Sequence, residues 1–181
     1  VKPQIGDQVT VGFYKSVRNS SVEFSVETYY KSIQNAVDFK GAAVLPLNHH
    51  VETDLVNAKG AAYGLEIAFR KTYGKLNGWM SYTYSRSLLQ TNNAYSSEIV
   101  NEGKYYPSSY DKPHAFNLVA NYKFNRRFNC SFTTTYSTGR PITLPLVKYE
   151  HGQSTRVYYS DRNQFRIPDY FRIDFSLNFE G

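Results

Sequence analysis

The sequence of 181 residues lacks several features that identify common classes of protein, or contains few of them. It has one cysteine, Cys130, so an internal disulfide is excluded. No run approaches the roughly 18 consecutive apolar residues of a membrane-spanning helix, and no long segment has apolar residues at helical spacing. There is no glycine-rich phosphate loop, no nucleophile elbow and no cysteine–histidine metal pattern. These absences leave an all-β protein as the fold to examine.

Positive charge is present but dispersed. The formal net charge is +6, yet Lys and Arg occur one or two at a time, as in Arg126-Arg127. Nucleic-acid binding needs a basic patch or stripe, so we predict no nucleic-acid partner. A basic lumen or a rim that faces lipid headgroups is equally consistent with this distribution.

Aromatic residues and strict alternation are what the sequence has in abundance. It contains 17 Tyr and 12 Phe, and tyrosine suits a membrane interface because its ring can be buried while its hydroxyl stays wet. From Tyr170 to Glu180 the apolar Phe171, Ile173, Phe175, Leu177 and Phe179 alternate with polar residues. Successive side chains of a strand point to opposite faces, so this segment has one apolar and one polar face.

The same alternation recurs along the whole chain and predicts seven strands of about 10 to 13 residues. A tilted strand that crosses a membrane needs about 9 to 11 residues, whereas strands of soluble proteins are nearer 5 or 6. Short turns and long polar connections alternate, and the long ones are residues 34–58, 89–112 and 139–167. The predicted strands are Gln8–Val17, Ser21–Ile33, Lys59–Thr72, Leu76–Leu88, Pro113–Phe124, Phe128–Thr138 and Tyr170–Glu180.

This pattern predicts an antiparallel transmembrane β-barrel with lipid on one face and a wet lumen on the other. Bacterial single-chain barrels have an even number of strands, eight or more, and an open sheet would expose two unpaired edges. We therefore expect residues 1–181 to be about seven consecutive strands of a larger barrel. No signal peptide is found at Val1, so we expect that a leader was removed or that the chain begins within a longer protein.

Several phrases, in their order and spacing, carry a resemblance to one family. They are Tyr29–Lys31, Tyr63–Glu66, Gly78–Arg86, Tyr106–His114, Thr138–Pro145, Arg162-Asn163 and Arg166–Asp174. The sequence resembles the C-terminal barrel portion of TonB-dependent outer-membrane receptors, in the Bacteroidota subgroup with a carboxypeptidase-regulatory-like N-terminal domain. Phe171 departs from the family pattern, which has a histidine or similar polar residue there.

The resemblance implies a function in the bacterial outer membrane. It implies a 22-stranded barrel closed by a plug, which imports a scarce or large nutrient such as a siderophore, glycan or peptide. It also implies energy supplied by TonB through an N-terminal box. The box, the plug, the early strands and the closing strand are not found in residues 1–181. Expected partners are outer-membrane lipid, TonB, the rest of the barrel with its plug, and a surface lipoprotein in some members.

Candidate site residues lie in the predicted external connections. Tyrosine stacks and hydrogen-bonds at small entropic cost, which suits sugars, peptides or siderophores. The candidate ligand-binding residues are Tyr95, Tyr105, Tyr106, Arg140, Tyr158, Tyr159 and Arg162. The alternative is that these tyrosines form an aromatic girdle or pack between loops.

Two polar motifs have structural interpretations. In Asp111-Lys112-Pro113-His114 the proline separates Asp from His at a junction between loop and strand, so we expect the motif to pin the loop to the rim. The adjacent His49 and His50 would point in opposite directions, which argues against a metal site. We predict no catalytic residue, no metal and no cofactor. The rival functions are an outer-membrane barrel enzyme and a soluble β-sandwich binding module.

Overall fold

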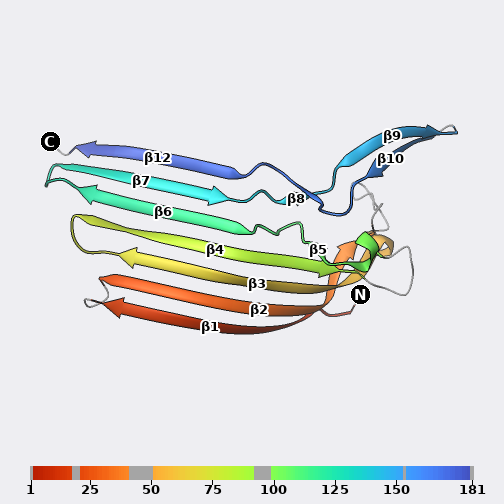
Figure 1. Cartoon of the computed structure of the whole chain (residues 1–181), viewed down its shortest axis with the longest axis horizontal. Helices are drawn as coiled ribbons and strands as arrows, with labels where there is room; N and C mark the ends of the chain where they lie inside the picture. Colours follow the sequence, from red (N-terminus) through yellow and green to blue (C-terminus); the bar gives the residue numbers. More distant parts are fainter. Residues whose placement is uncertain (1, 18–20, 41–50, 92–98, 153, 180–181) are drawn as a thin grey trace.

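The computed structural model describes residues 2–17, 21–40, 51–91, 99–152 and 154–179. Long strands lie side by side in one sheet (Figure 1). The seven long strands are β1 (Ile5–Val17), β2 (Val22–Phe39), β3 (Leu55–Lys71), β4 (Leu76–Gln90), β6 (His114–Lys123), β7 (Phe128–Ser137) and β12 (Tyr170–Phe179). Each overlaps one predicted strand, so the sequence pattern located all of them.

The sheet order is β1-β2-β3-β4-β6-β7-β12, and every neighbouring pair is antiparallel. The two-residue strand β5 (Tyr106–Pro107) also pairs with β4. Short connections lie at one end of the sheet, which we call the turn end, and long connections at the other, the loop end (Figure 1). At the turn end Gly74 has φ 94°, the left-handed conformation that a tight hairpin turn favours. This hairpin is the one that Tyr73-Gly74-Lys75 predicts.

The strand register gathers the apolar side chains onto one face, which we call the apolar face. Residues that pair directly across antiparallel strands share a face. One unbroken row of such partners crosses all seven strands: Phe13, Val26, Ile67, Tyr82, Phe116, Tyr136 and Phe171. The adjacent row, on the polar face, is Tyr14, Ser25, Ala68, Ser81, Asn117, Thr135 and Arg172.

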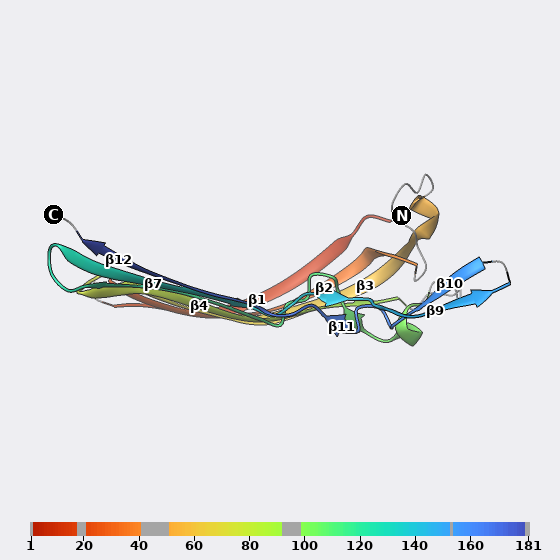
Figure 2. The ribbon, with the colours of Figure 1, turned by 90° about the horizontal axis from the view of Figure 1, so that it is seen from above.

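The apolar face is uncovered in the part of the chain that is described. Phe171 and Phe175 are each 62% exposed, although both are large and hydrophobic. Seen along its edge, the sheet is one curved layer (Figure 2). The buried hydrophobic residues gather instead at the loop end: Ala36, Val56, Ala58, Val100 and Tyr106. A soluble protein would lose much of its hydrophobic stabilisation in this arrangement.

The long connections contain more strand than the sequence predicts. The interpretation of residues 34–58 as a loop is wrong at both ends, because Ala36–Phe39 pairs with Leu55–Ala58 beyond an irregularity in the register. Asn35, with φ 55°, lies in that irregularity. A bulge shifts the alternation of side chains by one residue, so the period of two is interrupted and the sequence does not predict that the strand continues.

Residues 139–167, also expected to be a loop, hold two small ladders. One is the hairpin of β9 (Pro145–His151) and β10 (Ser154–Tyr159), which projects past the loop end (Figure 1). The other joins β8 (Pro141–Ile142) to β11 (Phe165–Arg166). Two short 3-10 helices, η1 (Val51–Asp54) and η3 (Asn101–Gly103), complete the described elements. Within the described residues, no helix has the length and apolar character needed to cross a membrane.

Candidate functional site at the loop end

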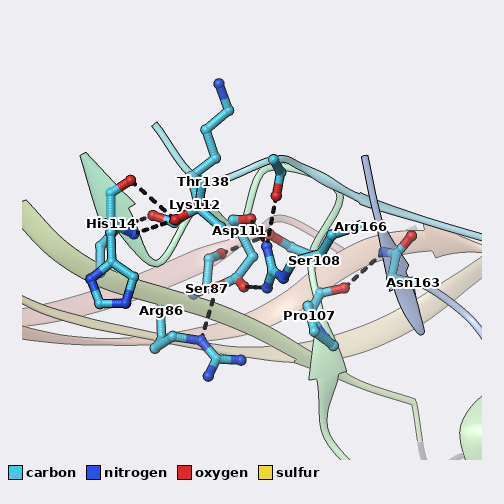
Figure 3. A network of polar contacts seen from close by, with 12 residues as sticks. Arg86, Ser87, Pro107, Ser108, Asp111, Lys112, His114, Thr138, Asn163 and Arg166 are labelled. Carbon is cyan, nitrogen blue, oxygen red and sulfur yellow. Dashed lines mark hydrogen bonds and ion pairs between the residues drawn. The ribbon is translucent and has the colours of Figure 1, made fainter. Parts of the chain in front are cut away.

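Asp111 is the centre of a buried polar network at the loop end. Its side chain is 0% exposed and accepts a hydrogen bond from the backbone N–H of Ser87 at 2.7 Å. Arg86 Nε donates to the same oxygen at 3.3 Å, and Arg166 is paired with the other oxygen. A buried carboxylate is tolerated only when its oxygens are satisfied in this way. Figure 3 shows the arginines converging on it from β4 and β11.

Asp111 also provides a hydrogen-bond acceptor for a backbone N–H of β4 that has no strand partner. β6 begins at His114, so the backbone of β4 beyond Ser85 has no partner in β6. The Asp111 carboxylate accepts the N–H of Ser87, and the N–H of Ser108 donates to Ser87 O at 2.8 Å. The edge of β4 is therefore satisfied where β6 stops. The structure agrees with the expectation that the Asp111–His114 motif pins its loop to the rim.

A second cluster ties the long connections to one another. Arg162 donates to Asp38 Oδ1 at 3.0 Å and to the carbonyl oxygens of Phe39 and Lys40 at 2.8 and 3.1 Å. Its backbone N–H donates to Asn101 Oδ1 at 2.8 Å. One guanidinium thus joins the third long connection to the end of β2, and its backbone joins the second. A planar guanidinium group, with several N–H donors in fixed positions, suits this bridging role.

The Tyr106 hydroxyl completes this cluster by donating to Asp38 Oδ2. Tyr106 is 1% exposed, and its burial, followed by the neighbouring Asp38 carboxylate, raises the pKa of the phenol above its ordinary value. The hydroxyl therefore stays protonated and remains a donor. The Asp38 carboxylate is thus paired with Arg162, and the Asp111 carboxylate with Arg86 and Arg166.

A third contact fixes the start of β12. Asp169 accepts hydrogen bonds from Tyr136 Oη at 2.6 Å and from Gly139 N at 2.9 Å. These donors lower the pKa of Asp169, the Tyr136 hydroxyl having the largest effect. A side chain at Gly139 would lie 1.8 Å from Ile167 O, so only glycine allows the two segments to approach this closely.

The candidate ligand-binding residues fall into two groups. Tyr106 and Arg162 are engaged in holding the loops together, as described above. Tyr105, Tyr158 and Tyr159 are 53%, 62% and 52% exposed, and the Arg140 side chain is exposed as well. Tyr158 and Tyr159 are adjacent on β10, whereas Tyr105 precedes β5. Tyr95, like His49 and His50, lies outside the described residues, so predictions about them remain predictions.

Sequence reasoning did not find Asp38, Asn163 and Arg166. The Asn163 side chain donates to Pro107 O at 2.7 Å, and its φ of 58° is one that asparagine tolerates better than most residues. The phrases that carry the family resemblance include Arg162-Asn163 and Arg166. That resemblance was the only signal in the sequence, because the partners of Arg162 are up to 124 residues away.

A single antiparallel layer with one continuous apolar face, short turns at one end and long connections at the other is consistent with a fragment of a membrane-spanning β-barrel. The family model described as TonB dependent receptor-like, beta-barrel, matches residues 1–180. The chain belongs to that family. No curated protein and no solved structure matches it. Proteins of this family lie in the bacterial outer membrane and function in transport. They interact with TonB and with the membrane.

Proposed function

We propose that residues 1–181 form part of the wall of a 22-stranded barrel that actively imports a scarce or large nutrient. The supporting observation is the unbroken apolar row across all seven strands, backed by a polar face. In the described sheet β1 and β12 each pair on one side only. An unpaired edge in lipid costs several kcal/mol per exposed polar group, so further strands would complete the barrel. A plug in the lumen and a TonB box would then couple import to energy.

Ligand capture is proposed to occur on the exposed aromatic surface of the loop end. Tyr105, Arg140, Tyr158 and Tyr159 carry this proposal because their side chains are exposed. The Asp111 and Arg162 clusters hold the connections that present them, which lowers the entropic cost of binding. A siderophore, a glycan and a peptide are all suited to tyrosine stacking and hydrogen bonding. A surface lipoprotein partner and the Bacteroidota origin belong to the same proposal.

We propose no enzymatic function. The Asp–His pair that an outer-membrane barrel enzyme would need is not formed, since Asp111 is bound to two arginines and His114 Nδ1 is 2.9 Å from Tyr82 Oη. A soluble β-sandwich would need a second sheet over the apolar face. The described residues place none there (Figure 2).

Uptake by a deletion strain tests the import proposal. Loss of growth on one class of nutrient, restored by the wild-type gene, is the expected result. The double variant Tyr158→Ala and Tyr159→Ala should lower uptake at limiting nutrient. The matched control is Tyr110→Ala, another exposed loop tyrosine, at 88% exposure, which lies outside the hairpin. A deletion strain with unchanged uptake of every class would refute import, and equal effects of the two sets of variants would refute the hairpin site.

A further inference from the structure

Arg86 is a cation on the apolar face of the sheet. The register pairs Tyr30 with Tyr63 and Tyr63 with Arg86, so the three share one face and one row. Tyr30 and Tyr63 are 55% and 37% exposed. In a barrel wall, exposed aromatic residues at the end of the apolar band mark the level of the lipid headgroups. Arg86 therefore lies at the headgroup level of the loop end.

Contacts with Asp111 fix the orientation of this guanidinium. Its Nε donates to Asp111, and among the described residues no partner is found for Nη1 and Nη2. Figure 3 shows the terminal nitrogens pointing away from the network. Asp111 is shared with Arg166, so this one carboxylate is divided between two guanidinium groups. A preoriented cation with unused donors is suited to bind an anion.

Lys59 is a second cation on the same face. It pairs with Gln90 of β4, four residues along β4 from Arg86, and its side chain is exposed. Four residues of strand span about 13 Å, so the two cations stand about that far apart along neighbouring strands. The long side chains of Arg and Lys could thus each reach one of two anionic groups on the same molecule.

We propose that Arg86 and Lys59 bind the phosphate groups of a phosphorylated lipid headgroup in the leaflet at the loop end. The proposal rests on the outer-membrane barrel function argued above. The argument for this occupant is charge complementarity at headgroup depth. Basic residues at that level attract anionic lipids, and the planar guanidinium matches phosphate with two parallel hydrogen bonds. The site would also connect bound lipid to the loops, because Arg86 shares Asp111 with Arg166.

Native mass spectrometry of the protein purified from outer membranes tests the site. The probes are diphosphorylated lipid A and the same lipid after removal of its phosphates. The wild-type protein should retain the phosphorylated lipid about tenfold better, and Arg86→Gln with Lys59→Gln should remove that preference. The matched control is Arg70→Gln, which removes one charge from the polar face of β3 beside Glu23. It should leave the preference unchanged.

Folding of each variant is checked by its heat-dependent shift in electrophoretic mobility. If Arg86→Gln fails to assemble, Lys59→Gln alone decides, with an expected loss of about threefold in retention of the phosphorylated lipid. An unchanged preference in the deciding variant, or no preference for phosphate in the wild type, would overturn the lipid site. Neither result would affect the import proposal, which fails instead if the deletion strain takes up every class of nutrient as the wild type does.

Discussion

Placing a charge at the middle of the apolar face should block assembly of the protein in the membrane. Leu118 lies at the centre of β6, where it pairs with Met80 on one side and Thr134 on the other. An arginine on the lipid face at the middle of the bilayer costs about 2–4 kcal/mol. That cost corresponds to a change of about 30-fold to nearly 1,000-fold in the folding equilibrium. Phe175→Arg, at the centre of β12, should behave alike.

Ser131→Arg is the matched control, because Ser131 lies on the polar face. Its Oγ donates to Asn121 Oδ1 at 2.7 Å, and loss of that bond costs about 1 kcal/mol. The assay is the amount of heat-modifiable protein in the outer-membrane fraction. Leu118→Arg and Phe175→Arg should be strongly depleted and Ser131→Arg only slightly. Normal assembly of both lipid-face variants, or equal depletion of all three, would refute the assignment of the faces.

The remaining predictions concern the loop end. Asp111→Asn should lower the free energy of unfolding, measured by urea titration, by about 2–3 kcal/mol. This loss is smaller than for a fully buried ion pair because the arginine partners of Asp111 are partly exposed. Arg162→Lys should speed chymotrypsin cleavage within residues 139–167, since lysine cannot reproduce the three-acceptor contact, and an unchanged rate would contradict the bridging role. Asp169, whose pKa is lowered in the folded protein, should stabilise it above the ordinary Asp pKa of about 4, and this contribution should disappear as the pH falls through the lower folded value. Asp169→Asn should therefore flatten the fall of the thermal midpoint at acid pH, and identical curves would exclude this contribution.

The fold was largely predictable because the side-chain period of a strand is visible in sequence. The predicted part of each long strand follows this alternation, which is clearest in Tyr170–Phe179. The prediction failed where that period was broken or absent. The irregularity near Asn35 hid the last third of β2, and the exposed hairpin β9–β10 has no face that must be apolar.

The candidate site was only partly predictable, for a different reason. The role of Asp111 could be inferred locally, since Asp before Pro at the start of a strand suggests a turn that holds a loop. The pairing of Arg162 with Asp38 joins residues 124 positions apart, and no local pattern indicates it. Tyr106 and Tyr158 are indistinguishable as loop tyrosines in the sequence, yet one is 1% and the other 62% exposed. Burial of this kind depends on the tertiary structure.

The most direct test is to find which residues of β12 are in contact with lipid. Single spin labels would be placed at each position from 170 to 179 in a Cys130→Ser background, in membranes, and collision with oxygen compared with collision with a water-soluble nickel complex. Labels at Phe171, Ile173, Phe175 and Leu177 should favour oxygen, and labels at the positions between them should favour nickel. Equal accessibility along the strand, or protection of the four apolar positions from both reagents, would show that these side chains do not meet lipid.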